Sequence, residues 1–166
     1  LSTGTSDDLV RCGIALYGVP PAPGLDGGLA LQPALSLKAR ASYLKRLAAG
    51  ARLSYGLRYR LDVGSVVATV PLGYADGVPR RLSEVGGEVL ALGVRRPIAG
   101  TITMDQILVD LCDDLEPDDE IVLLGRQGPD EISAWEWADR LGTIPYEVLC
   151  GISPRVPRRY LGGPAR

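Results

Sequence analysis

The sequence contains no histidine, no phenylalanine and a single methionine among its 166 residues. The absence of histidine excludes Ser-His-Asp and Cys-His nucleophile sites and the common zinc sites from this chain. Any acid–base chemistry must therefore use tyrosine, lysine, a carboxylate or a cofactor. Without phenylalanine, the core has to be built from leucine, valine, isoleucine and alanine.

Cysteine is also scarce. Cys12, Cys112 and Cys150 are odd in number and far apart in the sequence. This spacing indicates neither a disulfide framework nor a cysteine metal site, so no metal is predicted. We expect three scattered, buried thiols.

Long hydrophobic runs are missing, and so is any excess of positive charge. No stretch approaches the roughly 18 apolar residues of a membrane helix, and no signal-peptide pattern opens the chain. The formal net charge is −2, and the arginines are scattered or in short clusters, which argues against a nucleic-acid groove. A cytoplasmic protein is the default interpretation. The abrupt start at Leu1 is what a chain cut from a longer protein would show.

Glycine and proline are abundant, with 21 and 13 residues, which favours turns and short strands. Residues 19–33, "VPPAPGLDGGLALQP", are about half proline and glycine, so we predict an irregular connector and a domain boundary there. Before it, the sequence predicts a short helix or turn at 6–9 and a strand over 11–18.

After the connector, apolar and polar residues alternate with the period of a half-buried strand. The pattern predicts an all-β unit over roughly 34–160, with one or two small helices, as a barrel or sandwich. The predicted strands lie at 37–43, 57–61, 65–74, 100–111 and 121–125, and residues 84–93 are predicted to form a turn followed by a short strand.

One helix has clear end signals. Ser133 and Glu136 have the spacing of a capping box, and Gly142 suits the position just past the helix end. Pro145 is placed to open a second short helix. The tail after residue 152 contains two prolines and is predicted to be extended.

The stretch "PLGYADGVPR", residues 71–80, ends an apolar run with a tyrosine on a glycine-flanked corner. Tyr74 fits two interpretations. It is either a rim residue of a hairpin or a general acid or base whose pKa is lowered by its site. Arg80 and Arg81 are close enough in sequence to supply positive charge.

Two further motifs carry weaker signals. In "GTITMDQ", Met104 and Asp105 occupy adjacent positions of a predicted strand, either as ordinary strand residues or as a site. In "VRCGIALYG", Gly13 allows close approach of a ligand, and the backbone N–H groups of Gly13 and Ile14 could hold a phosphate.

Together, five segments resemble one family in the same order along the chain. "RCGIALYG", "PLGYADGVPRRLS", "GTITMDQILVDL", "EIVLLGRQG" and "ADRLGTIPYEVLCGISPRVPRRY" are similar to the C-terminal half of alanine racemases. The resemblance implies a pyridoxal-5′-phosphate (PLP) enzyme that works as a head-to-tail homodimer with active sites shared between subunits.

The resemblance also implies the fold class. We expect a mainly β, alanine-racemase C-terminal β-barrel-like domain with one or two short helices, preceded by a remnant of a (β/α)₈ PLP-binding barrel. Residues 1–33 would be the end of that barrel plus the Pro/Gly connector. Residues 34–166 would be the C-terminal β domain.

By this resemblance, Tyr74 matches the tyrosine that serves one face of the substrate Cα in the partner subunit's site. Met104 matches the residue whose backbone meets the substrate carboxylate, and Asp105 lies beside it. The family reaction interconverts L- and D-alanine, which supplies D-alanine for peptidoglycan.

The implied cofactor contacts are at the N-terminal end. Arg11 matches an arginine that hydrogen-bonds the PLP pyridine nitrogen, and its guanidinium keeps that nitrogen unprotonated. Gly13 and Ile14 match phosphate-binding backbone positions. Ser2 is the candidate phosphate-binding serine, although "LSTGTSDDL" is more similar to YggS-type PLP-binding barrel proteins.

The chain also departs from the family pattern. The lysine that holds PLP belongs to the first barrel strand, and Lys38 and Lys45 are both predicted on a wet face or edge. Pro154 stands where some members have a tyrosine, and Thr101 where some have an arginine.

We therefore expect a fragment that is inactive alone and supplies the acid/base tyrosine to a complete enzyme. The alternatives are a non-catalytic dimerisation or regulatory β module, or a racemase for another amino acid such as serine or lysine.

Overall fold

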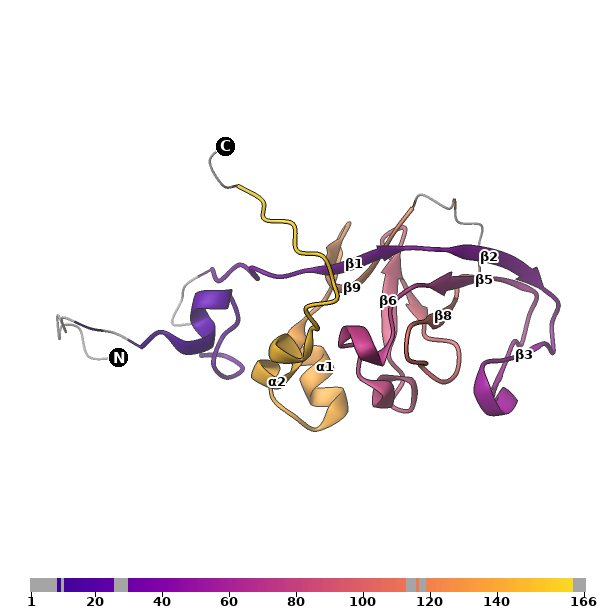
Figure 1. Ribbon diagram of the computed structural model, residues 1–166, viewed down its shortest axis with the longest axis horizontal. Helices are drawn as coiled ribbons and strands as arrows, with labels where there is room; N and C mark the ends of the chain where they lie inside the picture. The colour runs from indigo at the N-terminus through magenta and orange to yellow at the C-terminus, as the bar shows by residue number, and fades with distance from the viewer. Residues whose placement is uncertain (1–8, 10, 26–29, 113–115, 117–118, 163–166) are drawn as a thin grey trace. The chain divides into compact units, whose positions relative to one another are not determined.

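The computed structural model describes residues 9, 11–25, 30–112, 116 and 119–162. The chain divides into two compact units, Leu1–Leu35 and Ser36–Arg166, of which the second contains all the described strands (Figure 1). Among the described residues, no helix has the length and apolar character needed to cross a bilayer.

The first unit contains η1, a 3₁₀ helix over Gly13–Tyr17. The strand predicted over 11–18 is therefore wrong. Gly13 and Gly18 both have positive φ angles, of 56° and 73°, which interrupt an extended chain and suit glycine. Gly18 also packs tightly, because a Cβ there would lie 1.7 Å from the Gln32 carbonyl oxygen. Ser2 and nearly all of the predicted helix at 6–9 lie outside the described residues.

The second unit is mainly β, as predicted. All of its strand pairs within the described residues are antiparallel. One sheet has the order β1-β9-β6-β7 with β10 added to β9, a second has the order β2-β5-β8, and β3 pairs with β4. The strands are β1 (Leu37–Arg40), β2 (Tyr43–Leu47), β3 (Arg52–Leu53), β4 (Tyr59–Arg60), β5 (Ser65–Val70), β6 (Glu88–Ala91), β7 (Val94–Pro97), β8 (Ile107–Asp110), β9 (Glu120–Gln127) and β10 (Asp130–Ile132).

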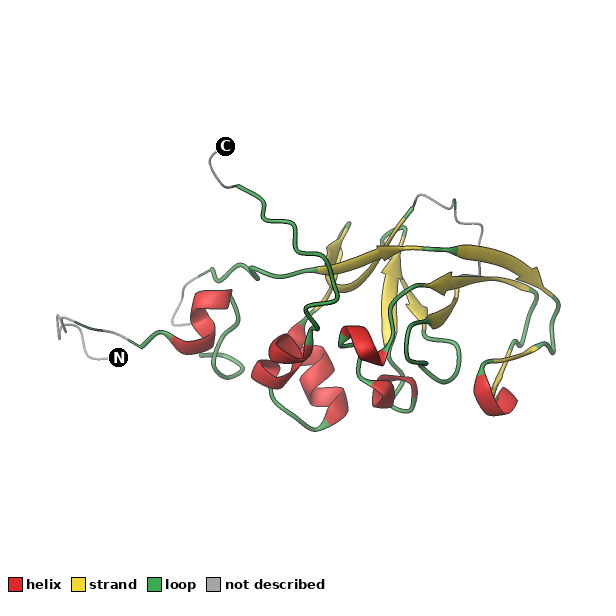
Figure 2. Ribbon diagram, viewed as in Figure 1, coloured by secondary structure: helices red, strands yellow, loops and turns green. Residues whose placement is uncertain are grey.

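The two larger sheets are joined at two places. The predicted strand at 37–43 breaks at Ala41–Ser42, so β1 lies in the first sheet and β2 in the second (Figure 2). An isolated bridge between Ile98 and Val109 links the end of β7 to β8. The two sheets are therefore connected, in keeping with the barrel-like domain that the family resemblance implies.

The core is made from aliphatic side chains, as the absence of phenylalanine requires. β9 contributes an unbroken buried run, which is the pattern of a strand covered on both faces. Trp137, on a helix, is the largest side chain that is almost completely buried. The strand residues at the centre of the core are Ala68, Val70, Val89, Leu90, Val109, Ile121, Val122 and Leu123.

Two α helices follow β10. α1 (Ala134–Leu141) begins after Ser133, whose side-chain oxygen accepts from the Glu136 N–H, and it ends at Gly142 with φ 70°. α2 (Pro145–Gly151) has its proline in the first turn. The predicted start of each helix and the end of α1 are confirmed.

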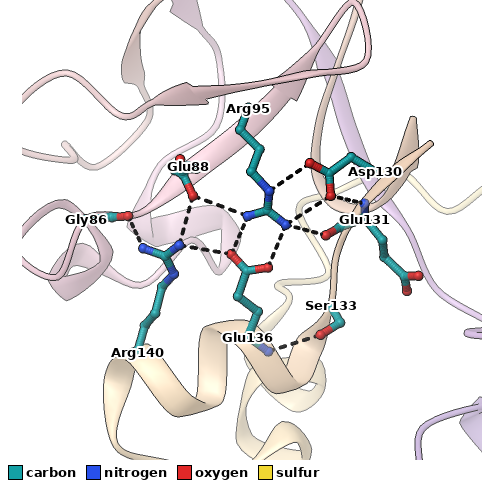
Figure 3. A network of polar contacts seen from close by, with 8 residues as sticks. All are labelled: Gly86, Glu88, Arg95, Asp130, Glu131, Ser133, Glu136 and Arg140. Carbon is teal, nitrogen blue, oxygen red and sulfur yellow. Dashed lines mark hydrogen bonds and ion pairs between the residues drawn. The ribbon is translucent and has the colours of Figure 1, made fainter. Parts of the chain in front are cut away.

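The Glu136 carboxylate has a different role from the one that the capping box predicts. It forms a two-pronged ion pair with Arg95 of β7, at 2.8 and 3.0 Å, and a contact with Arg140 one helical turn later (Figure 3). The Arg95 guanidinium also pairs with Asp130 at 2.9 and 3.2 Å and with Glu88 at 3.2 Å. This network fastens α1 to the β6–β7 hairpin and to β10.

The cysteine prediction is wrong. Cys12, Cys112 and Cys150 are all exposed. Cys112 follows β8 with φ 61°, and Cys150 is an exposed residue of α2. Their exposure shows that a scattered, unpaired cysteine is not necessarily a core residue.

The ion pair between Arg95 and Asp130 predicts a change of stability at acid pH. The hydrogen bonds from Arg95 and from the Glu131 N–H hold the pKa of Asp130 below its usual range. A lowered folded-state pKa stabilises the protein above the unfolded-state value of about 3.9, and this contribution is lost as the pH falls through the folded-state pKa. Asp130→Asn should therefore lower the melting temperature at pH 7, and this difference from the parent protein should shrink below about pH 4.

Thermal unfolding followed by circular dichroism between pH 2.5 and 7 measures this difference. Asp139→Asn, an exposed carboxylate on α1, is the matched control and should leave the melting temperature nearly unchanged. If the melting temperatures of Asp130→Asn and the parent protein differ by the same amount over the whole pH range, the lowered pKa of Asp130 does not contribute to stability.

Candidate functional site

Tyr74 opens a single 3₁₀ turn, η3 (Tyr74–Asp76), shortly after the buried strand β5. Its side chain is 44% exposed, whereas Leu72 just before it is buried. The turn closes through the Gly77 N–H, which donates to the Tyr74 carbonyl oxygen, and Gly77 has a φ of 102°. The buried strand and the turn thus present the phenol at the surface on a short, closed segment.

The Tyr74 turn is bound through its backbone to the Met104 loop, residues 100–106. The Tyr74 N–H donates to the Thr103 carbonyl oxygen and the Ala75 N–H to that of Met104, each at 3.0 Å. Gly73 permits this approach, because a Cβ there would lie 2.3 Å from the Met104 carbonyl oxygen. Two segments singled out from the sequence are therefore in direct contact.

Met104 and Asp105 do not lie on a strand, so that part of the prediction is wrong. Residues 100–106 form a loop, and β8 starts only at Ile107. The Thr103 hydroxyl bonds the Gln106 carbonyl oxygen at 2.9 Å and accepts from the Gln106 N–H at 3.1 Å. This local side-chain bonding competes with strand pairing, and it leaves the Met104 side chain 52% exposed.

Arg155 is the cation that joins these two segments, and sequence reasoning missed it. Its guanidinium pairs with Asp105 at 2.7 Å and with Asp76 at 3.4 Å. The hydrogen bond to Asp105 and the charge of Asp76 raise the pKa of Arg155. Asp76 is buried, and its other oxygen accepts from the Gly73 N–H at 2.9 Å.

Arg80 and Arg81, which follow Tyr74 closely in the sequence, have partners of their own. Arg80 pairs with Glu84 at 3.4 Å, and Arg81 donates to the Leu141 carbonyl oxygen at 3.2 Å. Arg155 could not be recognised from the sequence, which predicts only an extended tail after α2. Its pairing with Asp105 depends on folding that brings together residues 50 positions apart.

On the side of the Met104 loop that carries the Thr103 and Gln106 side chains, the surface is hollowed. The cavity has a volume of about 340 Å³. Tyr55 lines it with a side chain that is 74% exposed. The lining residues are Ser54, Tyr55, Thr101, Thr103, Gln106 and Leu108.

Tyr55 was also missed by sequence reasoning. It begins η2 (Tyr55–Leu57) between β3 and β4, just before the stretch 57–61, whose alternation predicts a strand. The observed strand β4 covers only Tyr59–Arg60. The available signal was the pair Tyr55-Gly56, a tyrosine beside a glycine as at Tyr74.

The predicted cofactor residues lie in the first unit. Gly13 and Ile14 form the first turn of η1, where backbone N–H groups have no acceptor within the helix. Arg11 is exposed just before them. These groups fit the phosphate and the pyridine nitrogen of PLP in chemical type.

Neither lysine is placed to hold a cofactor aldehyde at the cavity. Lys38 of β1 pairs with Glu120 at 2.7 Å, and Lys45 lies exposed on β2. Among the residues that the structure describes, no group of histidine, cysteine or carboxylate side chains could hold a metal ion.

The close approach of Gly73 predicts a specific sensitivity. Gly73→Ala must push the Met104 loop away from Tyr74, and we expect it to destabilise the fold by about 1–3 kcal/mol. Gly64→Ala is the control, because a Cβ there has its nearest contact at 3.5 Å. Urea unfolding of the two variants measures the difference, and equal stabilities would show that the Met104 loop yields freely.

Comparison with known proteins identifies the family. The sequence model for "Alanine racemase, C-terminal domain" matches residues 34–160. The chain is 51% identical over 157 residues to the alanine racemase of Symbiobacterium thermophilum, covering 93% of this chain and 41% of that protein. It is 47% identical over 155 residues to that of Halothermothrix orenii, covering 92% and 41%. The chain thus spans about two fifths of the length of these relatives.

Solved structures agree with the sequence comparison. The alanine racemase of Streptomyces coelicolor superposes with a TM-score of 0.86 at 43% identity, covering 94% of this chain and 41% of that one. The E. faecalis alanine racemase gives a TM-score of 0.84 at 40% identity, covering 89% and 40%. With its antiparallel β unit, the chain belongs to the alanine racemase family and contains that family's C-terminal domain.

Proposed function

We propose that this chain is the C-terminal part of an alanine racemase, which interconverts L- and D-alanine with PLP and supplies D-alanine for peptidoglycan. Residues 1–33 would end a PLP-binding barrel, and residues 34–166 would form the β domain. The enzyme would work in the cytoplasm as a homodimer, each β domain completing the partner's active site. The relatives of 47–51% identity support this proposal.

The observation that carries the proposal is the Met104 loop with an exposed tyrosine on either side. Tyr74 is held against the loop by backbone bonds to Thr103 and Met104. Tyr55 lines the cavity formed by the loop's Thr101, Thr103 and Gln106. A surface with a phenol, a cavity and an open rim can complete a site on another subunit.

The acid/base phenol is one of these two tyrosines. Tyr74 is the prediction from the sequence. The geometry favours Tyr55, because its side chain is more exposed, at 74% against 44%, and it lines the cavity, whereas the described lining does not include Tyr74. Ser54 before it has φ 61° and ψ −177°, a strained conformation of the kind that clusters at functional sites.

The residues of this chain would divide the chemistry as follows. When bound, PLP supplies the electron sink that lets the substrate Cα lose its proton. The Tyr55 phenol would give or take that proton on one face of Cα. The backbone of Met104 would meet the substrate carboxylate, and Arg155 would hold the Met104 loop to the Tyr74 turn through Asp105 and Asp76.

Cofactor contacts from this chain would come from its first unit. The N–H groups of Gly13 and Ile14 would bind the phosphate, and Arg11 would donate to the pyridine nitrogen and keep it unprotonated. Ser2 remains a candidate phosphate ligand. The base for the opposite face of Cα would be a lysine outside this chain, since Lys38 and Lys45 are both on the exposed surface of the β unit.

Two matched substitutions test the choice of phenol in the full-length racemase that contains this chain. Tyr55→Phe should lower kcat by about 10²–10⁴-fold, the usual contribution of a general acid or base. Tyr74→Phe should lower kcat less than about tenfold, because it removes a rim hydroxyl. Racemisation of alanine, with serine and lysine as comparison substrates, is followed by circular dichroism.

The two variants also define the opposite result. Normal kcat in Tyr55→Phe together with a large loss in Tyr74→Phe would return the acid/base role to Tyr74. Normal rates in both variants would leave the β domain without a catalytic phenol and favour a dimerisation or regulatory module.

A further inference from the structure

A buried polar cluster contacts the Tyr55 hairpin, the segment of β3, η2 and β4 over residues 52–60. Asp110, the last residue of β8, is 8% exposed, and Ser65, the first residue of β5, is 1% exposed. The Asp110 carboxylate accepts from the Tyr59 hydroxyl at 3.0 Å and from the Ser65 hydroxyl. Ser65 in turn accepts from the Cys112 N–H at 3.0 Å. Both carboxylate oxygens are thus bonded to neighbouring strands.

This cluster ties the Tyr55 hairpin to the second sheet. β3 and β4 share only two residue pairs, Arg52 with Arg60 and Leu53 with Tyr59. Two pairs form too small a sheet to be stable alone, and the first pair places like charges opposite each other. The Tyr59–Asp110 hydrogen bond connects β4 directly to β8, which pairs with β5.

Apolar packing holds the same hairpin from the same side. Tyr59 packs with Leu47, Ala51 and Leu108 against a buried cluster that includes Leu53 and Leu61. A ring lying on this cluster while its hydroxyl reaches Asp110 has little freedom to move. Removing the hydroxyl would therefore loosen the position of β4 without emptying the core.

The Met104 loop also holds the Tyr55 hairpin in place. The Ser54 hydroxyl donates to the Thr101 carbonyl oxygen at 2.8 Å. Gly100, with φ 83°, lies so close that a Cβ there would be 2.7 Å from the Ser54 Cβ and 3.4 Å from the Tyr59 Cβ. The strained Ser54 just before Tyr55 is thus fixed on both sides, as a strained residue must be.

Tyr59 is not itself suited to exchange protons. Burial and the hydrogen bond to Asp110 raise the pKa of Tyr59. The phenol therefore remains a neutral donor throughout the working pH range, and its contribution is positional.

We propose that Tyr59, anchored by Asp110 and Ser65, is a positioning residue that sets the direction of the Tyr55 phenol. This inference rests on the proposed function, in which Tyr55 is the acid/base. A displacement of about 1 Å at a reacting group is enough to lower a rate substantially, so the anchor is part of how the site works.

A double-mutant cycle in the full-length racemase tests the proposal. Tyr59→Phe should lower kcat about tenfold, with KM changed less than about twofold, because the misplaced phenol affects the transition state more than binding. In the Tyr55→Phe background, Tyr59→Phe should have no further effect, since it acts through Tyr55. Tyr43→Phe, an exposed tyrosine on β2, is the control and should keep the parent kcat.

The isotope effect supplies a second readout. Because enantiomers have equal free energies, kcat/KM must fall equally in both directions, but the α-deuterium isotope effect need not. Tyr59→Phe should raise that effect in the direction in which Tyr55 removes the proton, because this step then limits the rate more. It should lower the effect in the opposite direction, where Tyr55 returns the proton and the first abstraction becomes more reversible. A general loss of folding would not produce this asymmetry.

The outcomes separate the two claims. Normal activity in Tyr55→Phe would overturn the assignment of Tyr55 as the acid/base, and the inference with it. If Tyr55→Phe is inactive and Tyr59→Phe keeps full kcat, only the inference fails. If Tyr59→Phe lowers kcat equally in both backgrounds, Tyr59 acts through general stability and the positioning role is wrong.

Discussion

The candidate site depends on one constraint: the backbone of the Met104 loop lies in close contact with the turn of Tyr74 and with the turn of Tyr55. Gly73 lets one turn approach until N–H groups reach the carbonyl oxygens of Thr103 and Met104. Gly100 lets the other approach until Ser54 touches the loop. A side chain at either glycine would separate the pieces that have to act together.

Buried carboxylates make this contact rigid. Asp76 ties its own turn through the Gly73 N–H and ties the C-terminal tail through Arg155. Asp110 ties the Tyr55 hairpin to the second sheet through its hydrogen bond from Tyr59. A carboxylate that is taken out of water costs free energy unless it is fully bonded. These two groups therefore stabilise one arrangement and penalise others, which is the property that a shared active site needs.

Features that depend on local physics could be predicted from the sequence. Ser133, Gly142 and Pro145 mark helix ends through bonds and conformations within a few residues, and α1 and α2 appear where expected. Alternation predicted a mainly β unit. Features that depend on distant contacts could not be predicted. A hydrophobic pattern does not reveal that Thr103 and Gln106 bond locally and end the strand, nor that folding brings Arg155 to Asp105 or opens a cavity beside Tyr55.

The central claim is that a phenol of this β domain acts in the site of the other subunit, and subunit mixing tests it most directly. One full-length subunit carries Tyr55→Phe, and the other lacks the PLP lysine but keeps Tyr55. If sites are shared, random pairing in a two-fold dimer should restore about a quarter of the parent activity, because half the dimers regain one intact site. A mixture as inactive as its parents, with heterodimers shown to be present, would contradict the account.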